Sequence, residues 1–524
     1  MKKTLLGFTT FLILIVANGQ AQITFQKTYG GTNDEWANSI QQTTDSGYVI
    51  TGYTQSFGGG FAFYLLKTKA NGDTLWTKTF GGTADDQGKF VQPTSDGGYI
   101  AVGETNSFGA GGFDIYLIKT NGNGNFLWTK TFGGTGSDYG YSVQQTSDGG
   151  YIVVGETSSF GAGSNDVYLI RTDGNGDTLW TKTFGGTSSD YGYSVQQTTE
   201  GGYVIAGNFS FGGNDDAYLI KTDANGNSLW TKTFGGTSSE NGRSVRQITD
   251  GGYVIAGHTR SFGAGLYDVY VIKTDGNGNT LWTKTFGGTS SDYGYSIQQT
   301  SDGGYIVVGE ASSFGAGSHD AYLIKADGNG NYLWSKTFGS ISNDYGYSIQ
   351  HSSDGGYVLA GYTRSFGAGG NDIYIVKTNN NGNSGCSESN PATITTTPTT
   401  TVTNPVTQVS SGGIVGNSVT QTGNGGITTT LCITVGVGEI QQLNPVSIFP
   451  NPFFTQTTLQ SDKIFKDATL TTYNLYGQAI KQIKNISGRT ATLFRDNLPC
   501  GLYLIRITQD NTIIATDKLM ITDN

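Results

Sequence analysis

Cysteine and histidine are both scarce in this chain, with 3 cysteines and 3 histidines among 524 residues. Disulfides therefore cannot hold the main fold together, and its stability must come from core packing. The histidines, His258, His319 and His351, fall at different places in the pattern described below, and the cysteines lie outside that pattern. We therefore expect no His/Cys metal cluster.

The chain also has no basic cluster and few apolar runs. It carries 30 Lys and Arg against 40 Asp and Glu, for a formal net charge of −10. An acidic protein of this kind is a poor candidate for binding nucleic acid or an anionic membrane. The one apolar run, Leu5 to Val16, follows Lys2 and Lys3, precedes Gly19-Gln20-Ala21, and is too short to span a bilayer. These features predict a signal peptide over residues 1–21, with no membrane span later in the chain.

Signatures of catalysis are missing as well. No Gly-x-Ser-x-Gly elbow and no phosphate-binding loop occurs in a suitable context. Turns such as Asp173 to Asp177 resemble calcium loops in part, but they lack the later bidentate Glu and are short enough to be plain hairpins. The sequence therefore predicts no metal and no cofactor, with calcium at these turns as the alternative.

Glycine is abundant, with 82 copies that accompany aromatic and β-branched residues, and internal repetition explains them. Three anchors recur seven times each at spacings of 50 to 52 residues. They are Lys27, Lys78, Lys130, Lys182, Lys232, Lys284 and Lys336; Tyr48, Tyr99, Tyr151, Tyr203, Tyr253, Tyr305 and Tyr357; and Tyr64, Tyr116, Tyr168, Tyr218, Tyr270, Tyr322 and Tyr374. The chain thus contains seven units, and we assign residues 22–384 to them.

Each unit resolves into four strands. In one unit these are residues 191–197, 203–206, 217–220 and 228–234. Glu200-Gly201-Gly202 and Asn225-Gly226 supply tight turns that tolerate positive φ. Four antiparallel strands repeated about every 50 residues are typical of a β-propeller blade, whereas a solenoid would normally have shorter units. The predicted fold class is all-β, with a seven-bladed β-propeller of four-stranded blades.

The first and last units are complementary halves of one blade. Six units carry a tryptophan in their fourth strand, at Trp76, Trp128, Trp180, Trp230, Trp282 and Trp334. Phe25 takes that position near the N-terminus, and the last unit ends at the turn Asn380 to Asn383 without a fourth strand. Because an open array would leave both edges unpaired, we expect residues 23–29 to pair with residues 372–377. We expect the tryptophans to pack between blades, with ligand stacking as the alternative.

The segment from Val167 to Trp180 resembles the tryptophan-docking motif of quinoprotein-like propellers. The whole repeat resembles the SBBP-type β-propeller repeats of secreted bacterial proteins. This resemblance covers all seven units and implies the fold, but it implies no particular activity.

Residues 385–445 have a different composition, rich in Thr, Ser, Val and Gly. A loose seven-residue beat runs through them, at Pro391, Pro398, Pro405, Gly412 and then Gly426. Cys386 and Cys432 bracket the stretch, and in an exported protein they are candidates for a disulfide, with free thiols as the alternative. We predict a linker here, in the form of an extended stalk with some β-structure.

Residues 446–524 form a third region. It contains Ile448-Phe449-Pro450-Asn451-Pro452, Tyr473-Asn474-Leu475-Tyr476-Gly477-Gln478, Leu498-Pro499-Cys500-Gly501-Leu502-Tyr503 and Lys518-Leu519-Met520-Ile521. Taken alone, the region is compatible with a small β-sandwich. It resembles the C-terminal sorting domain of proteins exported by the type IX secretion system of the Bacteroidetes, although Tyr473 or Asn474 stands where that family often has Asp.

The resemblance implies a set of sorting-motif residues, Pro450, Asn451, Pro452, Gly477, Gly501, Tyr503 and Lys518. It also implies contact with the type IX machinery, passage across the outer membrane, removal of the domain, and attachment to the surface or release. The predicted location is therefore secreted or cell surface.

Candidate binding residues gather where the longer connections meet. In a propeller, the fourth-to-first and second-to-third connections share one face, and here these are the longer ones. An acid opens the first strand of every unit, at Glu35, Asp86, Asp138, Asp190, Glu240, Asp292 and Asp344, followed in five units by Trp36, Tyr139, Tyr191, Tyr293 or Tyr345. The end of the second strand varies between units, as Tyr53, Glu104, Glu156, Asn208, His258, Glu310 and Tyr362.

Carboxylates beside aromatic platforms suit sugars or cations. The candidate ligand-binding residues are Glu104, Glu156, His258, Glu310, Tyr53, Tyr362, Asp138, Asp190, Asp292, Tyr139, Tyr191 and Tyr293. The alternative is that the acids bind loop amides and the tyrosines pack between blades.

Three function classes remain open. The first is a surface binding or adhesion module for glycan, peptide or matrix. The second is a carbohydrate-active enzyme that uses paired carboxylates, and the third is a spacer without a specific ligand. The acids that open the first strands recur in every unit, whereas a catalytic pair should break the repeat symmetry, so the sequence favours the binding module.

Overall fold

The computed structural model describes residues 22–398, 400–403, 408–410, 414–416, 421–423, 427–435, 446–474, 478–510 and 512–523. All regular structure in these ranges is β-strand. The larger of two compact units is Gln22–Val435, and the sheet domain near the C-terminus belongs to the other. The predicted signal peptide, residues 1–21, lies outside the described residues.

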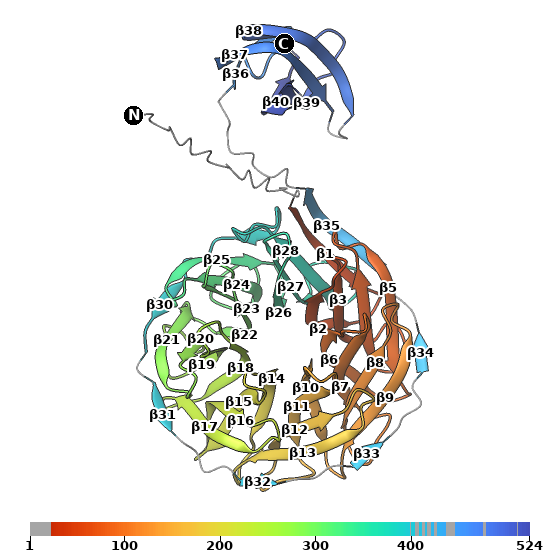
Figure 1. Ribbon diagram of the computed structural model, residues 1–524, viewed down its shortest axis with the longest axis vertical. Coiled ribbons are helices and arrows are strands. Elements are labelled where there is room, and N and C mark those ends of the chain that lie inside the picture. Colours follow the sequence, from red (N-terminus) through yellow and green to blue (C-terminus); the bar gives the residue numbers. More distant parts are fainter. Residues whose placement is uncertain are drawn as a thin grey trace, which may run out of the picture. The chain divides into compact units, whose positions relative to one another are not determined.

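The larger unit is a ring of seven sheets around a central axis (Figure 1). Blade 1 contains β2 (Glu35–Gln42), β3 (Tyr48–Thr54), β4 (Ala62–Thr68) and β5 (Thr74–Gly81). Blade 2 contains β6 (Asp86–Pro93), β7 (Tyr99–Thr105), β8 (Asp114–Thr120) and β9 (Phe126–Gly133). Blade 3 contains β10 (Asp138–Gln145), β11 (Tyr151–Thr157), β12 (Asp166–Thr172) and β13 (Thr178–Gly185). Blade 4 contains β14 (Tyr191–Gln197), β15 (Tyr203–Phe211), β16 (Asn214–Thr222) and β17 (Ser228–Gly235).

The other three blades repeat this arrangement. Blade 5 contains β18 (Glu240–Gln247), β19 (Tyr253–Thr259), β20 (Asp268–Thr274) and β21 (Thr280–Gly287). Blade 6 contains β22 (Asp292–Gln299), β23 (Tyr305–Ala311), β24 (Asp320–Ala326) and β25 (Tyr332–Phe338). Blade 7 contains β26 (Asp344–His351), β27 (Tyr357–Thr363), β28 (Asp372–Thr378) and β1 (Ile23–Gly30). The first strand of each blade lies innermost, around the central channel (Figure 1). The predicted seven-bladed propeller is confirmed.

The N-terminal strand closes the ring. β1 pairs antiparallel with β28, with Phe25 opposite Lys377 and Tyr29 opposite Ile373. Phe25 is fully buried and meets Tyr48 of blade 1 edge to face, with ring centroids 6.5 Å apart. Phe25 therefore takes the place of the blade tryptophans, and the predicted closure is confirmed.

The tryptophans pack between blades, as expected. Each one meets a second-strand tyrosine of the next blade, with ring centroids 5.7–6.0 Å apart. Gly176 in the β12–β13 turn has φ +80°, and a Cβ there would fall 2.7 Å from the Trp128 ring. The turn glycine is thus required both for its backbone conformation and for close contact with the tryptophan.

A belt of short strands surrounds the ring and was not predicted. It adds one outer strand to every blade, in reverse order around the ring (Figure 1). β29 (Glu388–Ser389) pairs with β25, β30 (Ile394–Thr396) with β21, β31 (Thr401–Thr403) with β17, β32 (Gln408–Ser410) with β13, β33 (Ile414–Gly416) with β9, β34 (Gln421–Gly423) with β5, and β35 (Ile427–Val435) with β1.

The seven-residue spacing therefore matches the passage of the belt from one blade to the next. Seven residues of extended chain span roughly 23 Å at about 3.3 Å per residue. The stretch is not a stalk, and the ring's compact unit extends to Val435 rather than ending at residue 384. The physical reason is that the outermost strand of each four-stranded blade has an unpaired edge, which the belt covers.

A disulfide closes the belt. Cys386 and Cys432 are bonded across a sequence separation of 46 residues. β35 runs beside β1 from Ile23 opposite Val435 to Gly30 opposite Ile427. The ring-closing strand is thus held on both sides, by β28 and by the end of the belt.

The C-terminal unit is a curled sheet. It contains β36 (Val446–Phe449), β37 (Gln456–Tyr473), β38 (Ala479–Phe494), β39 (Gly501–Gln509) and β40 (Thr512–Ile521). Leu459, Leu470, Leu493, Ile505 and Leu519 lie in its core. We predicted a small β-sandwich here; the domain is all-β, and its strands form one connected, curled sheet. Among the described residues, no helix is long and apolar enough to cross a membrane.

The described sorting-motif residues lie in the segment after β36 and in strands β39 and β40. Asn451 Nδ2 donates to the Lys518 carbonyl (2.9 Å), and the Met520 N–H donates to Asn451 Oδ1 (2.8 Å). Pro450 and Pro452 flank Asn451, and the Pro450 carbonyl accepts from Thr457 Oγ1 (2.6 Å). Gly501 begins β39, where the Tyr503 hydroxyl donates to the Pro499 carbonyl (2.7 Å). Gly477 lies outside the described residues.

Candidate functional site

The acids that open the first strands are structural. Each of the seven carboxylates accepts a hydrogen bond from the backbone N–H four residues earlier. For Asp138, Asp190 and Asp292 the distances are 2.9, 2.6 and 2.8 Å, and all three side chains have no exposed surface. These contacts favour the alternative interpretation, in which the three acids bind loop amides and order the corner between blades.

A second buried acid lies beside many of them, at the start of the third strand. A Cβ on Gly133 would fall 2.1 Å from Asp114 Oδ1 and 2.7 Å from Asp138 Oδ2, so the two carboxylates flank the same glycine. Burial, with the charge of Asp138 as a smaller cause, raises the pKa of Asp114 to about 6. These pairs make the corners sensitive to pH.

A β-bulge occurs at the same place in the innermost strand of every blade. Two residues after the candidate aromatic, the pairing register shifts by one residue. The bulged residues are Asn38, Lys89, Tyr141, Tyr193, Arg243, Tyr295 and Tyr347. Bulges commonly re-aim a side chain next to a functional site. Sequence reasoning missed this position, although Lys89 and Arg243 break its run of tyrosines.

The bulged residues meet the varying residues at the ends of the second strands, and we call the two sets together the collar. Lys89 Nζ lies 3.3 Å from Glu104 Oε1 in blade 2. Tyr141 interacts with Glu156 in blade 3 and Tyr295 with Glu310 in blade 6, and each interaction lowers the pKa of the carboxyl group against the larger effect of burial. In blade 7 the rings of Tyr347 and Tyr362 lie 5.8 Å apart. The structure therefore brings the predicted Glu104, Glu156, Glu310 and Tyr362 into one zone around the channel.

Several collar groups are buried with part of their hydrogen-bonding capacity unused. Glu104, Glu156 and Glu310 are 5–6% exposed, and the Oε2 atom of each has no hydrogen-bond partner. His258 Nδ1 and Arg243 Nε are likewise buried and unpaired. A buried polar atom without a partner costs about 1–3 kcal/mol. The collar thus holds buried acceptors and donors that contacts within the described residues leave unsatisfied.

Burial also shifts the acid–base properties of the collar. It raises the pKa of Glu156 and of Glu310 to about 7. It lowers the pKa of His258 to about 3, with the Arg243 charge as a further cause. At neutral pH the collar therefore contains a neutral imidazole and two carboxyl groups close to half-protonation.

Aromatic rings line the remaining collar. Trp36 stacks on Tyr53 with centroids 4.5 Å apart, and Tyr345 stacks on Tyr362 at the same distance. The Trp36 and Tyr362 rings lie 6.0 Å apart and join blades 1 and 7. On the far side of the channel, the Arg243 guanidinium lies 4.1 Å from the centroid of Tyr193.

The predicted tyrosines next to the bulges fall into two groups. Tyr293 meets His258 (4.8 Å) and Tyr191 stacks on Tyr193 (6.1 Å), so both touch the collar. Tyr139 packs on the loop residue Phe113, with centroids 5.5 Å apart.

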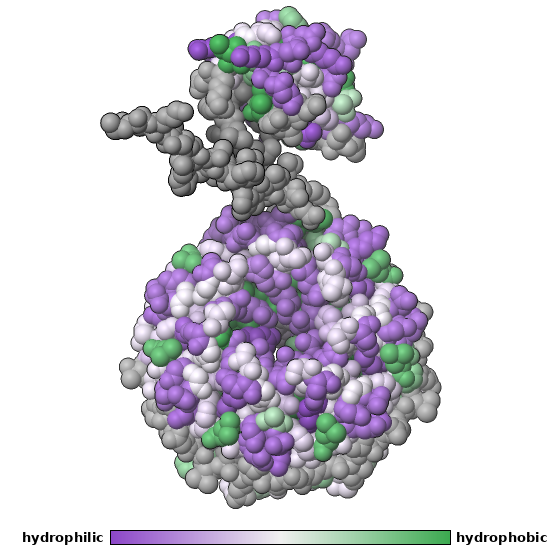
Figure 2. Space-filling model, in the orientation of Figure 1, coloured by the Kyte–Doolittle hydropathy of each residue, from purple (hydrophilic) through white to green (hydrophobic). Residues whose placement is uncertain are grey.

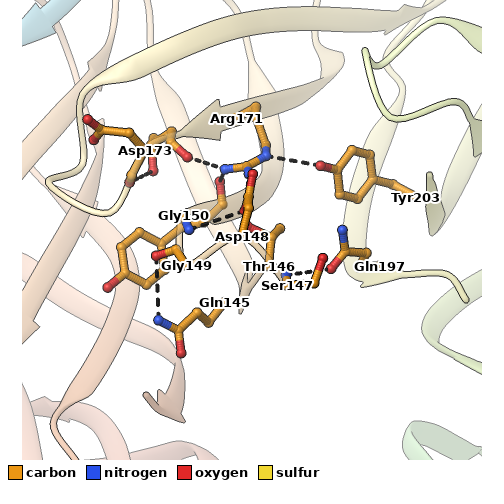
Figure 3. Close-up of polar contacts among 12 residues, drawn as sticks. Gln145, Thr146, Ser147, Asp148, Gly149, Gly150, Arg171, Asp173, Gln197 and Tyr203 are labelled. Atoms are coloured by element: carbon orange, nitrogen blue, oxygen red, sulfur yellow. Dashed lines mark hydrogen bonds and ion pairs between the residues drawn. The ribbon is translucent and has the colours of Figure 1, made fainter. Parts of the chain in front are cut away.

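The tight-turn face differs from the collar because its polar groups are mostly paired with one another (Figure 3). Asp148 forms an ion pair with Arg171, whose Nε donates to the Tyr203 hydroxyl of the next blade (3.0 Å). The Ser147 N–H donates to Gln197 Oε1, also of the next blade (2.9 Å). Six of the seven blades have such an ion pair, which joins the tight turn to the third strand of the same blade.

The Asp-containing hairpins use their carboxylates in the same local way. Asp173 Oδ1 accepts from the backbone N–H groups of Asn175 and Asp177, both at 2.9 Å. The space-filling view shows a mostly hydrophilic ring face that is hollowed at its centre, where the channel opens (Figure 2). Among the described residues, five of the buried side-chain atoms without a partner belong to the collar.

One family of known proteins matches part of the chain. Residues 447–522 match the family described as a secretion system C-terminal sorting domain. The chain is therefore a β-propeller protein that the type IX secretion system sorts to the cell surface or the medium. No curated protein matches the chain.

Several solved structures are similar at low identity. The extracellular domain of the putative hybrid two component system BT3049 from B. thetaiotaomicron is 11% identical, with a TM-score of 0.34; the match covers 93% of this chain and 55% of that one. PorZ, described as an essential bacterial surface component of the type-IX secretion system of Porphyromonas gingivalis, is 9% identical, with a TM-score of 0.29 and coverage of 94% and 75%. Sqt1 from Chaetomium thermophilum is 10% identical, with a TM-score of 0.37 and coverage of 69% and 98%. This chain spans about half of the first of these proteins.

Proposed function

We propose that this exported propeller is a surface binding module and that its collar binds a glycan. The observation that carries the proposal is the convergence of unpaired, buried polar atoms with aromatic rings at one layer of the channel. Oε2 of Glu104, Glu156 and Glu310 and Nε of Arg243 are all unpaired there. On the tight-turn face the charged groups pair with each other instead, as Asp148 does with Arg171, which also donates to Tyr203.

A sugar supplies what this arrangement lacks. Its hydroxyl groups donate to carboxylate oxygens and accept from a guanidinium, while its C–H face packs on aromatic rings. The collar offers stacked rings at Trp36 and Tyr53 beside Lys89 and Glu104. A peptide or a matrix protein is the other ligand class that such a surface suits.

A specific observation favours an enzyme as the second candidate. Glu156 and Glu310 have pKa values of about 7, in the range of a general acid at neutral pH. Unlike the acids of the first strands, they do not recur in every blade, since Tyr, Asn or His takes their position elsewhere. A catalytic pair is expected to break the repeat symmetry in this way.

The test is a glycan array probed with the chain from residue 22 onward, together with a hydrolase screen on the same sugars. Replacing Glu104, Glu156 and Glu310 by Gln keeps their size and should weaken binding by about tenfold or more, because charged hydrogen bonds are lost. The matched control is Glu200→Gln in a tight turn, which should bind normally. Equal binding by the triple variant contradicts the proposal, and release of shortened sugar assigns the enzyme instead.

A further inference from the structure

A second layer of polar side chains lies deeper in the channel, three residues further along each innermost strand. At about 3.3 Å per residue it is roughly 10 Å from the bulges, toward the tight turns. It consists of Gln41, Gln92, Gln144, Gln196, Arg246, Gln298 and Gln350, one from each blade. Together with Phe90, Val143 and Val195, these residues line a cavity of about 240 Å³. Six blades thus contribute an amide, and blade 5 contributes a guanidinium.

Three of the amides are turned so that their carbonyl oxygens face the neighbouring blade. Gln92 Oε1 accepts from the Gln145 N–H (2.7 Å), and Gln144 Oε1 accepts from the Gln197 N–H (2.6 Å). Gln196 Oε1 accepts from the backbone N–H next to Arg246 in the same manner (2.7 Å). The side-chain NH₂ groups, which are donors only, remain for the cavity.

Arg246 has no counter-ion among the residues that the structure describes. Its Nη1 donates to the carbonyl of the adjacent Val245 (2.9 Å). Burial lowers its pKa to about 10, and no carboxylate opposes this shift. The side chain is only partly buried and lines the channel cavity, so its guanidinium is open to an anion from solution. The arginine stands where the six other blades have glutamine.

We propose that this cavity binds a compact oxyanion group, namely a carboxylate, sulfate or phosphate group. The guanidinium of Arg246 neutralises the charge with its planar set of donors, which matches two oxygens of such a group. The glutamine NH₂ groups supply further donors around it. This site does not depend on the glycan proposal, because it uses none of the collar residues.

The experiment titrates the chain from residue 22 onward by calorimetry at constant ionic strength. The probes are sodium sulfate, inorganic phosphate and sodium glucuronate, with sodium chloride and glucose as controls. At least one oxyanion should bind saturably and raise the Tm, and the one that binds identifies the source of the group. Arg246→Gln should weaken that binding by about tenfold or more. This variant restores the residue of the six other blades, so it should fold.

Two comparisons separate the possible outcomes. Arg260→Gln removes the same charge from a loop of the same blade and should bind normally, as should the Gln variant of the three collar glutamates. Without anion, Arg246→Gln should be at least as stable as the wild type, because it removes an unpaired charge. The proposal is overturned if no oxyanion binds saturably, if chloride binds equally well, if Arg246→Gln binds like the wild type, or if that variant is less stable without anion.

Discussion

Replacing Cys386 and Cys432 by serine tests whether the belt holds the ring closed. The disulfide closes a loop with a sequence separation of 46 residues, and the chain entropy lost by the unfolded state corresponds to about 4 kcal/mol. Because the belt strands between the two cysteines pair with the outer strands of the other blades, the loss should affect the whole ring rather than one blade. The double variant should therefore lose about 4 kcal/mol of unfolding free energy.

The assay is equilibrium unfolding in guanidinium chloride, followed by tryptophan fluorescence because six of the seven tryptophans lie between blades. Cys500→Ser is the matched control, since Cys500 is free and exposed and its loss should leave stability unchanged. Hydrogen exchange should also speed up along the outer strands of the double variant. If the double variant loses less than about 1 kcal/mol of unfolding free energy and hydrogen exchange is unchanged, the belt does not hold the ring closed. A loss that small is close to the roughly 0.5 kcal/mol of an ordinary surface substitution.

Three further predictions follow from other parts of the molecule. Folding raises the pKa of five buried aspartates to about 6, namely Asp114, Asp190, Asp216, Asp268 and Asp320. Because the folded state binds these protons more tightly than the unfolded state, Tm should fall as pH rises from about 4 to 6. A Tm that rises over this range contradicts the assignment. Deleting residues 22–30 should leave β28 and β35 unpaired and cause aggregation, whereas a stable monomer on gel filtration would argue against closure by β1. Removing residues 446–524 should leave a folded propeller trapped in the periplasm of the native host, and normal surface display of that truncated chain would show that sorting does not need the domain.

The ring could be predicted because each unit carries its own evidence. One lysine anchor and two tyrosine anchors recur seven times, and a tryptophan recurs six times. Phe25 and the turn at Asn380 to Asn383 show which end lacks which strand. The belt could not be predicted in the same way. Its strands are mostly three residues long, too short for an alternating pattern, and their pairing partners lie up to several hundred residues away. The seven-residue beat was visible, but composition alone did not connect it with seven blades.

The candidate site was predicted only in part, for a similar reason. An aspartate that binds loop amides and an aspartate that binds a ligand look alike in sequence, so Asp138 and Glu156 could not be ranked. The bulge occurs in the innermost strand of every blade, as in β10, β14 and β22. Because all units share it, comparing the units in sequence does not reveal it. The sequence does show where one unit departs from the others. Three such departures lie on the innermost strands, around the channel: Lys89, Arg243 and Arg246.

The most direct test of binding at the collar is hydrogen–deuterium exchange with and without a glycan that the array identifies. Binding at the collar should slow exchange in the innermost strands around the bulges, above all in β10 near Tyr141 and β22 near Tyr295, with little change elsewhere. Protection confined to the tight turns around Asp148 and Asp302, with exchange at the bulges unchanged, would contradict it.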